Sequence, residues 1–288
     1  MMMTVSTLQL SVAKSWLKRL YAASLVLIGA YAGAVTAHEF WIEPEVFEIA
    51  SGSPLRAYVR VGQDLKGDSL PLFRQAIERF EIHAGERQIP LASRIGDDPI
   101  VNQALEHDGL VILSCVSAES LLRHEEAQKF LSFLDYEGIQ WVAEAHKLRG
   151  LPPFGFSEAY QRFAKSLVRV GSSDAVDADR VLGLRFELIL TSDPYNDPGR
   201  GLSGQLLWQA KPMAGTQISL FRREADQVDR QVLRTDANGR FSLEGALLPG
   251  IYLLNAVHMV EAAADRDDSA VWKSFWASTT FAVDASNR

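Results

Sequence analysis

Two histidines in this sequence could together hold a metal ion. His38 follows a segment that ends Val35-Thr36-Ala37, and cleavage there would make His38 the first residue of the mature chain. A terminal histidine can chelate a metal with its α-amine and its imidazole Nδ1. His258 lies in an otherwise apolar segment, where a buried imidazole without a partner would be costly. Because nickel(II) and copper(II) both favour nitrogen ligands, the sequence predicts a transition-metal site formed by His38 and His258.

His83 and Glu43 are candidates for further ligands of this site. For each of these four residues the alternative is structural, since a strand histidine more often hydrogen-bonds within the fold than binds metal. The remaining histidines lie next to glutamates, and we expect them on the solvated surface: His107, His124 and His146. The sequence has no phosphate-binding glycine loop, no GxSxG motif and no HExxH pair. We therefore expect no catalytic residues, no other cofactor and a protein that is not an enzyme.

Residues 1–37 have the pattern of a signal peptide. Lys14, Lys18 and Arg19 precede an uncharged, mostly apolar run that ends at Ala37. This pattern predicts export to the periplasm, cleavage, and no membrane insertion of the mature chain. The alternative is an uncleaved anchor, because the run approaches the roughly 17–20 residues that can span a bilayer.

The charge balance argues against nucleic-acid binding. The chain has 29 basic and 36 acidic residues, and removing the three basic residues of the leader leaves 26 against 36, a net charge of −10. An acidic surface repels nucleic acid. Cys115 is the only cysteine, so an intramolecular disulfide is excluded.

The first part of the mature chain reads as β-structure. Leu55, Ala57, Val59 and Val61 alternate with polar or aromatic residues, which predicts a strand with one buried face. Residues 79–91 predict a hairpin, and a buried strand should follow near 109–116. Short strands at this spacing are typical of a β-sandwich.

Helical periodicity interrupts these strands near 120–168. Apolar positions predict one helix that ends before Gly138 and a second over residues 139–148. A third helix is predicted from the cap Ser157 to the stop Gly171. Its buried stripe would comprise Tyr160, Phe163, Ala164, Leu167 and Val168, with Arg162 and Lys165 on its polar side.

The last third of the chain returns to strands. Residues 191–201 are dense in Asp, Pro and Gly and predict a linker. After it, the Asp236–Gly239 segment predicts a hairpin turn, because Asn and Gly tolerate positive φ. Three aromatic residues of the last strand are expected to be buried, with a carbohydrate platform as the alternative: Trp272, Phe275 and Trp276.

These patterns predict a mainly β protein with two β-sandwich-like domains. The first would span residues 38–190 and carry the helical insertion. The second, over residues 202–285, would be transthyretin- or Ig-like. No internal repeat supports any other division.

Several segments together carry a family resemblance. They occur in the order AHEFWIEP, FLSFLDYEGI, EAYQRFAKSLVRVG, LGLRFELILTSDPY, KPMAGTQISLF, TDANGRFSL, PGIYLLNAVHM and WKSFWASTTF. On these motifs the chain resembles a family of secreted bacterial proteins of unknown function, domain of unknown function 4198, grouped with periplasmic components of nickel and cobalt uptake. The motifs after residue 202 also resemble a transthyretin-like or carboxypeptidase-regulatory-like β-sandwich.

The resemblance implies a periplasmic protein that binds nickel or cobalt and serves metal uptake or delivery, with a membrane metal transporter as partner. The predicted histidine pair adds copper as a further candidate metal. The alternative is a structural or interaction module that binds no metal and recognises a protein or another cell-envelope partner. Binding in the predicted site would require deprotonated ligands, so it should weaken as the pH falls through the imidazole pKa.

Overall fold

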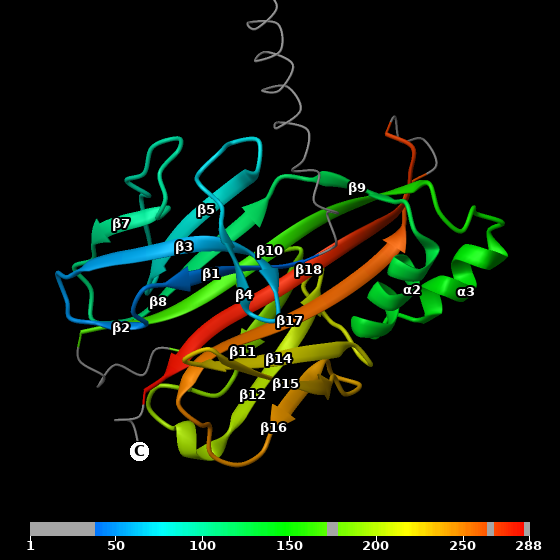
Figure 1. The fold of residues 1–288 in the computed structure, drawn as a ribbon. Coiled ribbons are helices and arrows are strands. Elements are labelled where there is room, and N and C mark those ends of the chain that lie inside the picture. Colours follow the sequence, from blue (N-terminus) through cyan, green and yellow to red (C-terminus); the bar gives the residue numbers. More distant parts are fainter. Residues whose placement is uncertain (1–37, 172–177, 264–267, 285–288) are drawn as a thin grey trace, which may run out of the picture. The chain divides into compact units, whose positions relative to one another are not determined.

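The computed structural model describes residues 38–171, 178–263 and 268–284, and the predicted signal peptide lies outside them. The fold is mainly β, as predicted (Figure 1). The strands are β1 Glu39–Pro44, β2 Glu48–Ile49, β3 Pro54–Gln63, β4 Lys66–Ser69, β5 Ile77–Ala84, β6 Arg87–Ile89, β7 Val101–Ala104, β8 Gly109–Ser117, β9 Ser120–His124, β10 Phe156–Val170, β11 Phe186–Leu190, β12 Leu202–Trp208, β13 Lys211–Pro212, β14 Gln217–Glu224, β15 Gln227–Arg234, β16 Arg240–Leu243, β17 Gly250–Glu261 and β18 Ala270–Val283. The helices are α2 Ala127–Tyr136, α3 Trp141–Leu148 and the 3-10 helix η2 Pro198–Arg200. None of the helices in the described ranges combines the length and the apolar character needed to cross a bilayer.

The described strands form three sheets. The largest, called the central sheet below, has the order β15-β14-β17-β18-β10-β8-β5-β6, and β2 and β9 also pair with β10. The N-sheet has the order β1-β3-β4 with β7 beside β3, and the C-sheet has the order β11-β12-β13 with β16 beside β12. Figure 1 shows β10, β18 and β17 running side by side in the central sheet. Strands that precede residues 191–201 in the sequence and strands that follow them thus share one sheet. The boundaries of the two predicted domains stay a prediction.

The N-sheet and the C-sheet contact opposite faces of the central sheet. Along β18, Ser278 and Thr280 each donate a hydrogen bond of 2.6 Å to a backbone carbonyl of β1. Between them, Thr279 donates one of 3.1 Å to a backbone carbonyl of β11. Successive side chains of a strand point to opposite faces, so these faces are called the β1 face and the β11 face below. The central sheet is therefore the shared layer of a sandwich-like arrangement.

Each face carries its own apolar core. The alternation predicted in β3 is confirmed, because Leu55, Ala57 and Val59 are buried against apolar side chains of β5, β8 and β10. On the β11 face, Phe186 and Leu188 of β11 belong to the cluster that also holds apolar side chains of β10, β17 and β18. Burying one such side chain contributes about 1.5–3 kcal/mol, so these two cores hold the three sheets together.

The prediction of a third helix over residues 157–171 is wrong, because this segment forms the strand β10. β10 pairs in parallel with β18 and antiparallel with β8 and β9, and it is covered on both faces. Arg162 lies 5.8 Å from the Phe40 ring on the β1 face, whereas Lys165 pairs with Glu187 on the β11 face. A strand buried on both faces has no polar side, so its apolar residues also fit a helical stripe.

The other two predicted helices are present as α2 and α3. Phe130, Leu134 and Val142 bury their side chains in one cluster with Trp272 and Trp276 of β18. The helices lie at the end of the central sheet that carries β9 (Figure 1). The aromatic residues of β18 are buried, as expected, with exposures of 0% for Trp272 and Phe275 and 2% for Trp276.

The Asp236–Gly239 segment turns the chain as predicted but does not form a hairpin. Asp236 Oδ1 accepts hydrogen bonds from the backbone N–H of Asn238 and of Arg240, at 2.8 and 2.9 Å. The flanking strands belong to different sheets, because β15 pairs with β14 and β16 pairs with β12. Local turn chemistry reverses the chain but does not choose the partner strand.

Candidate functional site

His258 lies on the β11 face, surrounded by aromatic rings. Its ring centroid is 4.6 Å from that of Trp208 and 6.1 Å from that of Phe186. Its cross-strand neighbour on β18 is Phe275. Burial lowers the pKa of His258 to about 4, so the imidazole is neutral at neutral pH.

His38 lies at the other face of the central sheet. It directly precedes β1, and its pKa is lowered by partial burial and then by the charge of Arg162, a residue of the β1 face. The backbone layer of the central sheet therefore lies between His38 and His258. The structure does not bring these two predicted ligands together.

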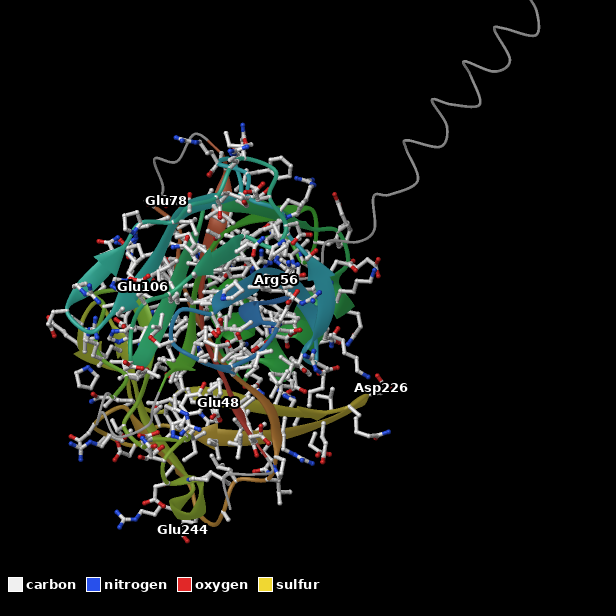
Figure 2. All side chains as sticks on the ribbon, turned by 90° about the vertical axis from the view of Figure 1, so that its left-hand side faces the viewer. Glu48, Arg56, Glu78, Glu106, Asp226 and Glu244 are labelled. Carbon is white, nitrogen blue, oxygen red and sulfur yellow. The ribbon has the colours of Figure 1, made fainter. Side chains whose placement is uncertain are left out.

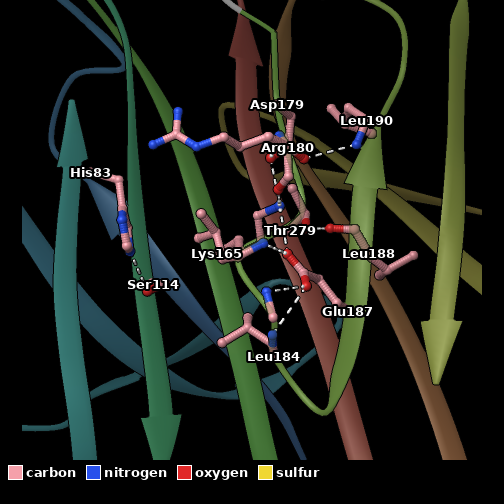
Figure 3. Close-up of polar contacts among 12 residues, drawn as sticks. His83, Ser114, Lys165, Asp179, Arg180, Leu184, Glu187, Leu188, Leu190 and Thr279 are labelled. Carbon is pink, nitrogen blue, oxygen red and sulfur yellow. Dashed lines mark hydrogen bonds and ion pairs between the residues drawn. The ribbon is translucent and has the colours of Figure 1, made fainter. Parts of the chain in front are cut away.

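His83 lies apart from both, in β5. Its Nε2 is 3.4 Å from Glu81 Oε2. The same atom is 3.4 Å from Ser114 Oγ (Figure 3). Burial lowers the pKa of His83, and the charge of Glu81 opposes this shift. Within residues 38–171, 178–263 and 268–284, no group of three or more His, Cys, Asp or Glu side chains could hold a metal ion. The predicted nickel, cobalt or copper site stays a prediction.

Glu43 lines a pocket. Its Oε1 pairs with Arg60 Nε at 3.2 Å and with Arg223 Nη2 at 3.1 Å. Its Oε2 accepts a hydrogen bond of 2.9 Å from Trp41 Nε1. Both carboxylate oxygens are thus engaged, and Glu43 is an internal counter-ion for two guanidinium groups.

The pocket beside Glu43 has a volume of about 560 Å³, within the range of small-ligand sites. It is lined by Glu43, Arg60, Lys66, Gly67, Arg223, Ala225 and Asp226. Three of these side chains are cationic and two are anionic, so the lining carries one net positive charge in a chain whose formal charge is −7. Figure 2 shows Asp226 at the tip of the β14–β15 hairpin. Arginine forks beside a lysine suit the recognition of an oxyanion.

The turn between β3 and β4 supports one wall of this pocket. Asp64 and Leu65 both have left-handed backbone, with φ of 54° and 56°. For a residue such as leucine this conformation costs roughly 1–2 kcal/mol. Leu65 is fully buried and belongs to one apolar cluster with Trp41 and Phe221, which offsets the strain. Arg223 Nη1 donates a hydrogen bond of 2.8 Å to Leu65 O, which ties the pocket to the turn.

A buried acidic cluster interacts with the same turn. Tyr136 Oη donates a hydrogen bond of 2.5 Å to Asp64 Oδ1. Glu39 and Glu137 are 2% and 4% exposed, and burial raises the pKa of Glu39 to about 7 and that of Glu137 to about 8. The charge of Arg230 opposes both pKa shifts, yet its Nη2 donates to a neutral oxygen, Tyr136 O, at 2.8 Å. Glu39, Asp64 and Glu137 are called the acidic cluster below.

A second group of buried charges, on the β11 face, was not predicted from the sequence. Lys165 Nζ lies 2.5 Å from Asp179 Oδ1 and 3.4 Å from Glu187 Oε1 (Figure 3). Asp179 Oδ2 accepts the backbone N–H of Leu190, and Glu187 accepts three backbone N–H groups of residues 182–184. Burial raises the pKa of Glu187, and Lys165 opposes the shift. The sequence signal is a single lysine within the apolar part of β10. Lys165, Asp179 and Glu187 are called the lysine cluster below.

His124 and His146 are buried, so the prediction of solvated positions is wrong for both. His124 Nε2 lies 2.7 Å from Glu158 Oε2, and Ser274 Oγ donates to the other oxygen of Glu158. The carboxylate thus separates the histidine from the hydroxyl, and this set lacks the base-to-nucleophile contact of a hydrolase triad. His146 Nδ1 accepts a hydrogen bond of 2.9 Å from Trp272 Nε1, which anchors α3 on β18. The His124 ring also contacts Phe130 of α2, with ring centroids 4.7 Å apart, so both histidines hold a helix on the sheet.

The family model "Domain of unknown function (DUF4198)" matches residues 35–260, and the chain belongs to this family. The predicted family membership is confirmed. No curated protein matches the chain.

Among solved structures, the chain is similar to a tetra-tandem repeat in the extending region of a large adhesion protein, with 12% identity and a TM-score of 0.20 over 85% of this chain and 49% of that one. The chain therefore spans about half the length of that structure. A second similar structure is the D0-D1 domain of intimin, with 10% identity, a TM-score of 0.22 and coverages of 84% and 97%. A third comprises the three N-terminal domains of the highly immunogenic outer capsid protein Hoc of bacteriophage RB49, with 9% identity, a TM-score of 0.21 and coverages of 85% and 70%. TM-scores this low do not define a common function.

Proposed function

We propose that the protein is a non-enzymatic binding protein of the bacterial cell envelope and that its pocket takes a small oxyanionic ligand. The observation that carries the proposal is the convergence of Arg60, Lys66 and Arg223 on one pocket from three different strands. Guanidinium groups match the paired oxygens of a carboxylate or sulfate, and lysine adds a mobile point charge.

The local electrostatics favour an anion over a cation. Arg60 and Arg223 are 27% and 20% exposed, so an incoming oxyanion can reach both. Glu43, 12% exposed, holds the two guanidinium groups in place when no ligand is bound. A cation entering here would meet three positive side chains before it could use Glu43.

Substitution of Glu43 separates this proposal from metal binding. Glu43 competes with a bound anion for Arg60 and Arg223, so E43Q should raise the affinity for sulfate. A unit charge about 4 Å away is worth about 1 kcal/mol in water, roughly fivefold in affinity. Titration calorimetry with sodium sulfate at constant ionic strength measures this change. If Glu43 were a metal ligand, E43Q would instead weaken nickel or copper binding and leave sulfate unaffected.

Substitution of Lys66 tests the pocket without disturbing its ion pairs. K66Q should weaken sulfate binding roughly threefold or more, because it removes one cation from the lining. Lys211 is exposed on β13 of the C-sheet, and K211Q is the matched control with the same change in net charge. Succinate in place of sulfate distinguishes a carboxylate ligand from a tetrahedral anion. Equal sulfate binding by wild type, K66Q and E43Q would overturn the proposal.

The role in nickel, cobalt or copper uptake, with a membrane metal transporter as partner, remains a separate prediction. So do the periplasmic location and the transthyretin-like character of residues 202–285. Calorimetry of the mature, untagged protein with nickel and copper tests the metal prediction directly. A loss of metal binding in both His38→Ala and His258→Ala would favour it.

A further inference from the structure

Glu137, at the C-terminal end of α2, faces a site with too few hydrogen-bond donors. Asn255 Nδ2 lies 3.5 Å from Glu137 Oε2, and Oδ1 of the same amide has no hydrogen-bond partner among the described residues. Glu39 Oε2 has none there either. Asn255 and Glu39 are 1% and 2% exposed, so both acceptors are cut off from water. Buried acceptors without donors are destabilising.

The charges around Glu137 are also unbalanced. Three carboxylates of the acidic cluster face two guanidinium groups, that of Arg230 and, at Glu39, that of Arg162, so all ionised they carry one uncompensated negative charge. Arg230 Nη2 bonds to Ser219 Oγ at 2.8 Å and to a backbone carbonyl, not to a carboxylate. The groups that face Glu137 directly or through Glu39 are Glu39 of β1, Asp64 of the β3–β4 turn, Tyr136 of α2, Arg162 of β10, Arg230 of β15 and Asn255 of β17.

A proton on Glu137 reduces both defects. It removes one negative charge, and the resulting O–H can donate to Asn255 Oδ1 once that amide rotates. We propose that Glu137 is a proton-binding site, and that loss of its proton as the pH rises weakens anion binding in the pocket. The second half of this inference rests on the proposed function of the pocket.

The β3–β4 turn connects the two sites. On one side Asp64 accepts the hydrogen bond from Tyr136, the residue before Glu137. On the other side Leu65 O accepts the hydrogen bond from Arg223 of the pocket. An ionised Glu137 repels Asp64, and the turn is already strained at both of its central residues. Deprotonation therefore loosens the turn and with it the position of Arg223.

The proton site is tested first, by carbon NMR of the glutamate carboxyl groups between pH 5 and pH 10. One signal of the wild type should titrate near pH 8 and be missing in E137Q, which is isosteric with the protonated acid. Glu244 is exposed, and E244Q is the matched control that should keep the signal. Glu39, whose pKa is about 7, gives a second signal above pH 6 that E137Q should keep. If the signal that is missing in E137Q titrates below about pH 6, the proton site is overturned.

The coupling is tested by sulfate titration at pH 6.5 and pH 9.0. Sulfate stays fully ionised over this range, so its own titration cannot contribute. Wild type should bind sulfate about threefold or more weakly at pH 9.0, and E137Q nearly equally at both values. Equal binding by the wild type at both pH values would overturn the coupling.

The two proposals fail in different ways. Absence of sulfate binding at both pH values overturns the pocket and the coupling, while the NMR signal near pH 8 still supports the proton site. Sulfate binding that responds to K66Q but not to pH supports the pocket and overturns the coupling. If E137Q does not fold, the wild-type NMR titration alone decides the proton site, and Y136F, which cuts the link to Asp64, takes its place in the sulfate test.

Discussion

The acidic cluster and the lysine cluster both bury charge against the central sheet, but they are built differently. In the lysine cluster, Lys165 contacts both carboxylates, and each carboxylate also accepts backbone N–H groups. In the acidic cluster, the guanidinium group of Arg230 bonds to neutral oxygens, and a carboxylate oxygen of Glu39 has no partner among the described residues. The first resembles a structural clamp that closes the loop before β11. The acidic cluster is instead stabilised when one of its carboxyl groups binds a proton.

The difference shows that burial alone does not decide whether a charge is fixed or titratable. Burial raises the pKa of a carboxyl group in both clusters. Lys165 and the backbone donors counter this effect at Glu187, whereas neighbouring carboxylates reinforce it at Glu137. The supply of donors is therefore the variable that separates the two clusters.

The largest effect should come from removing the central cation of the lysine cluster. K165M leaves Asp179 and Glu187 buried without their counter-ion, which should cost about 3–5 kcal/mol of the free energy of unfolding. Urea denaturation at pH 7 measures it. K211M on the exposed β13 should change stability by less than about 0.5 kcal/mol. A loss below about 1 kcal/mol for K165M would contradict the structural role.

Removing one anion of the lysine cluster should cost less. D179N keeps the size of the side chain but gives up the ionic contact with Lys165, which lies 2.5 Å away. Loss of a hydrogen bond to a charged group is expected to cost about 1.5–3 kcal/mol, again by urea denaturation. D226N, at the exposed tip of the β14–β15 hairpin, is the matched control. A D179N variant that is more stable than wild type would show that the charges of the lysine cluster, like those of the acidic cluster, destabilise the fold.

Neutralising a carboxylate of the acidic cluster should raise the free energy of unfolding instead of lowering it. The pKa of Glu137, about 8 in the folded protein, lies above the ordinary glutamate value of 4.5. The folded state therefore binds the proton more tightly, and wild type loses stability as the pH rises from about 4.5 through 8. E137Q should be more stable than wild type at pH 9 by on the order of 1–2 kcal/mol, and equal to it near pH 4.5. Thermal unfolding across this pH range checks the prediction, and a less stable E137Q at pH 9 would contradict it.

The smallest effect should come from His258, a half-buried group with aromatic neighbours whose pKa is shifted by burial and not by a neighbouring charge. His258 is neutral at pH 8, so H258F should change stability by less than about 0.5 kcal/mol there. Because the folded pKa of about 4 lies below the ordinary histidine value of 6.5, wild type should lose stability as the pH falls through this interval, and H258F should lose less. Urea midpoints at pH 8 and pH 5 measure both. A large loss at pH 8 would mean that the imidazole binds a partner, as the metal prediction requires.

The sequence by itself determined the local elements. The alternation of Leu55, Ala57 and Val59 predicted β3, and apolar spacing predicted α2 and α3, because one face of each is buried and the other solvated. The turn residues at Asp236–Gly239 predicted a reversal of the chain. β10 could not be predicted in this way, since layers on both of its faces erase the alternation that distinguishes a strand from a helix.

Only the tertiary structure decided which of these residues meet. His38 and His258 could be identified from the sequence as possible metal ligands, but the central sheet lies between them. Glu43 was recognised as a ligand candidate, yet its partners Arg60 and Arg223 come from β3 and β14, far apart in the sequence. The order in which strands pair, and the face of the sheet on which a side chain lies, depend on which apolar surfaces are buried together. These surfaces come from residues far apart in the sequence, so a local pattern does not specify them.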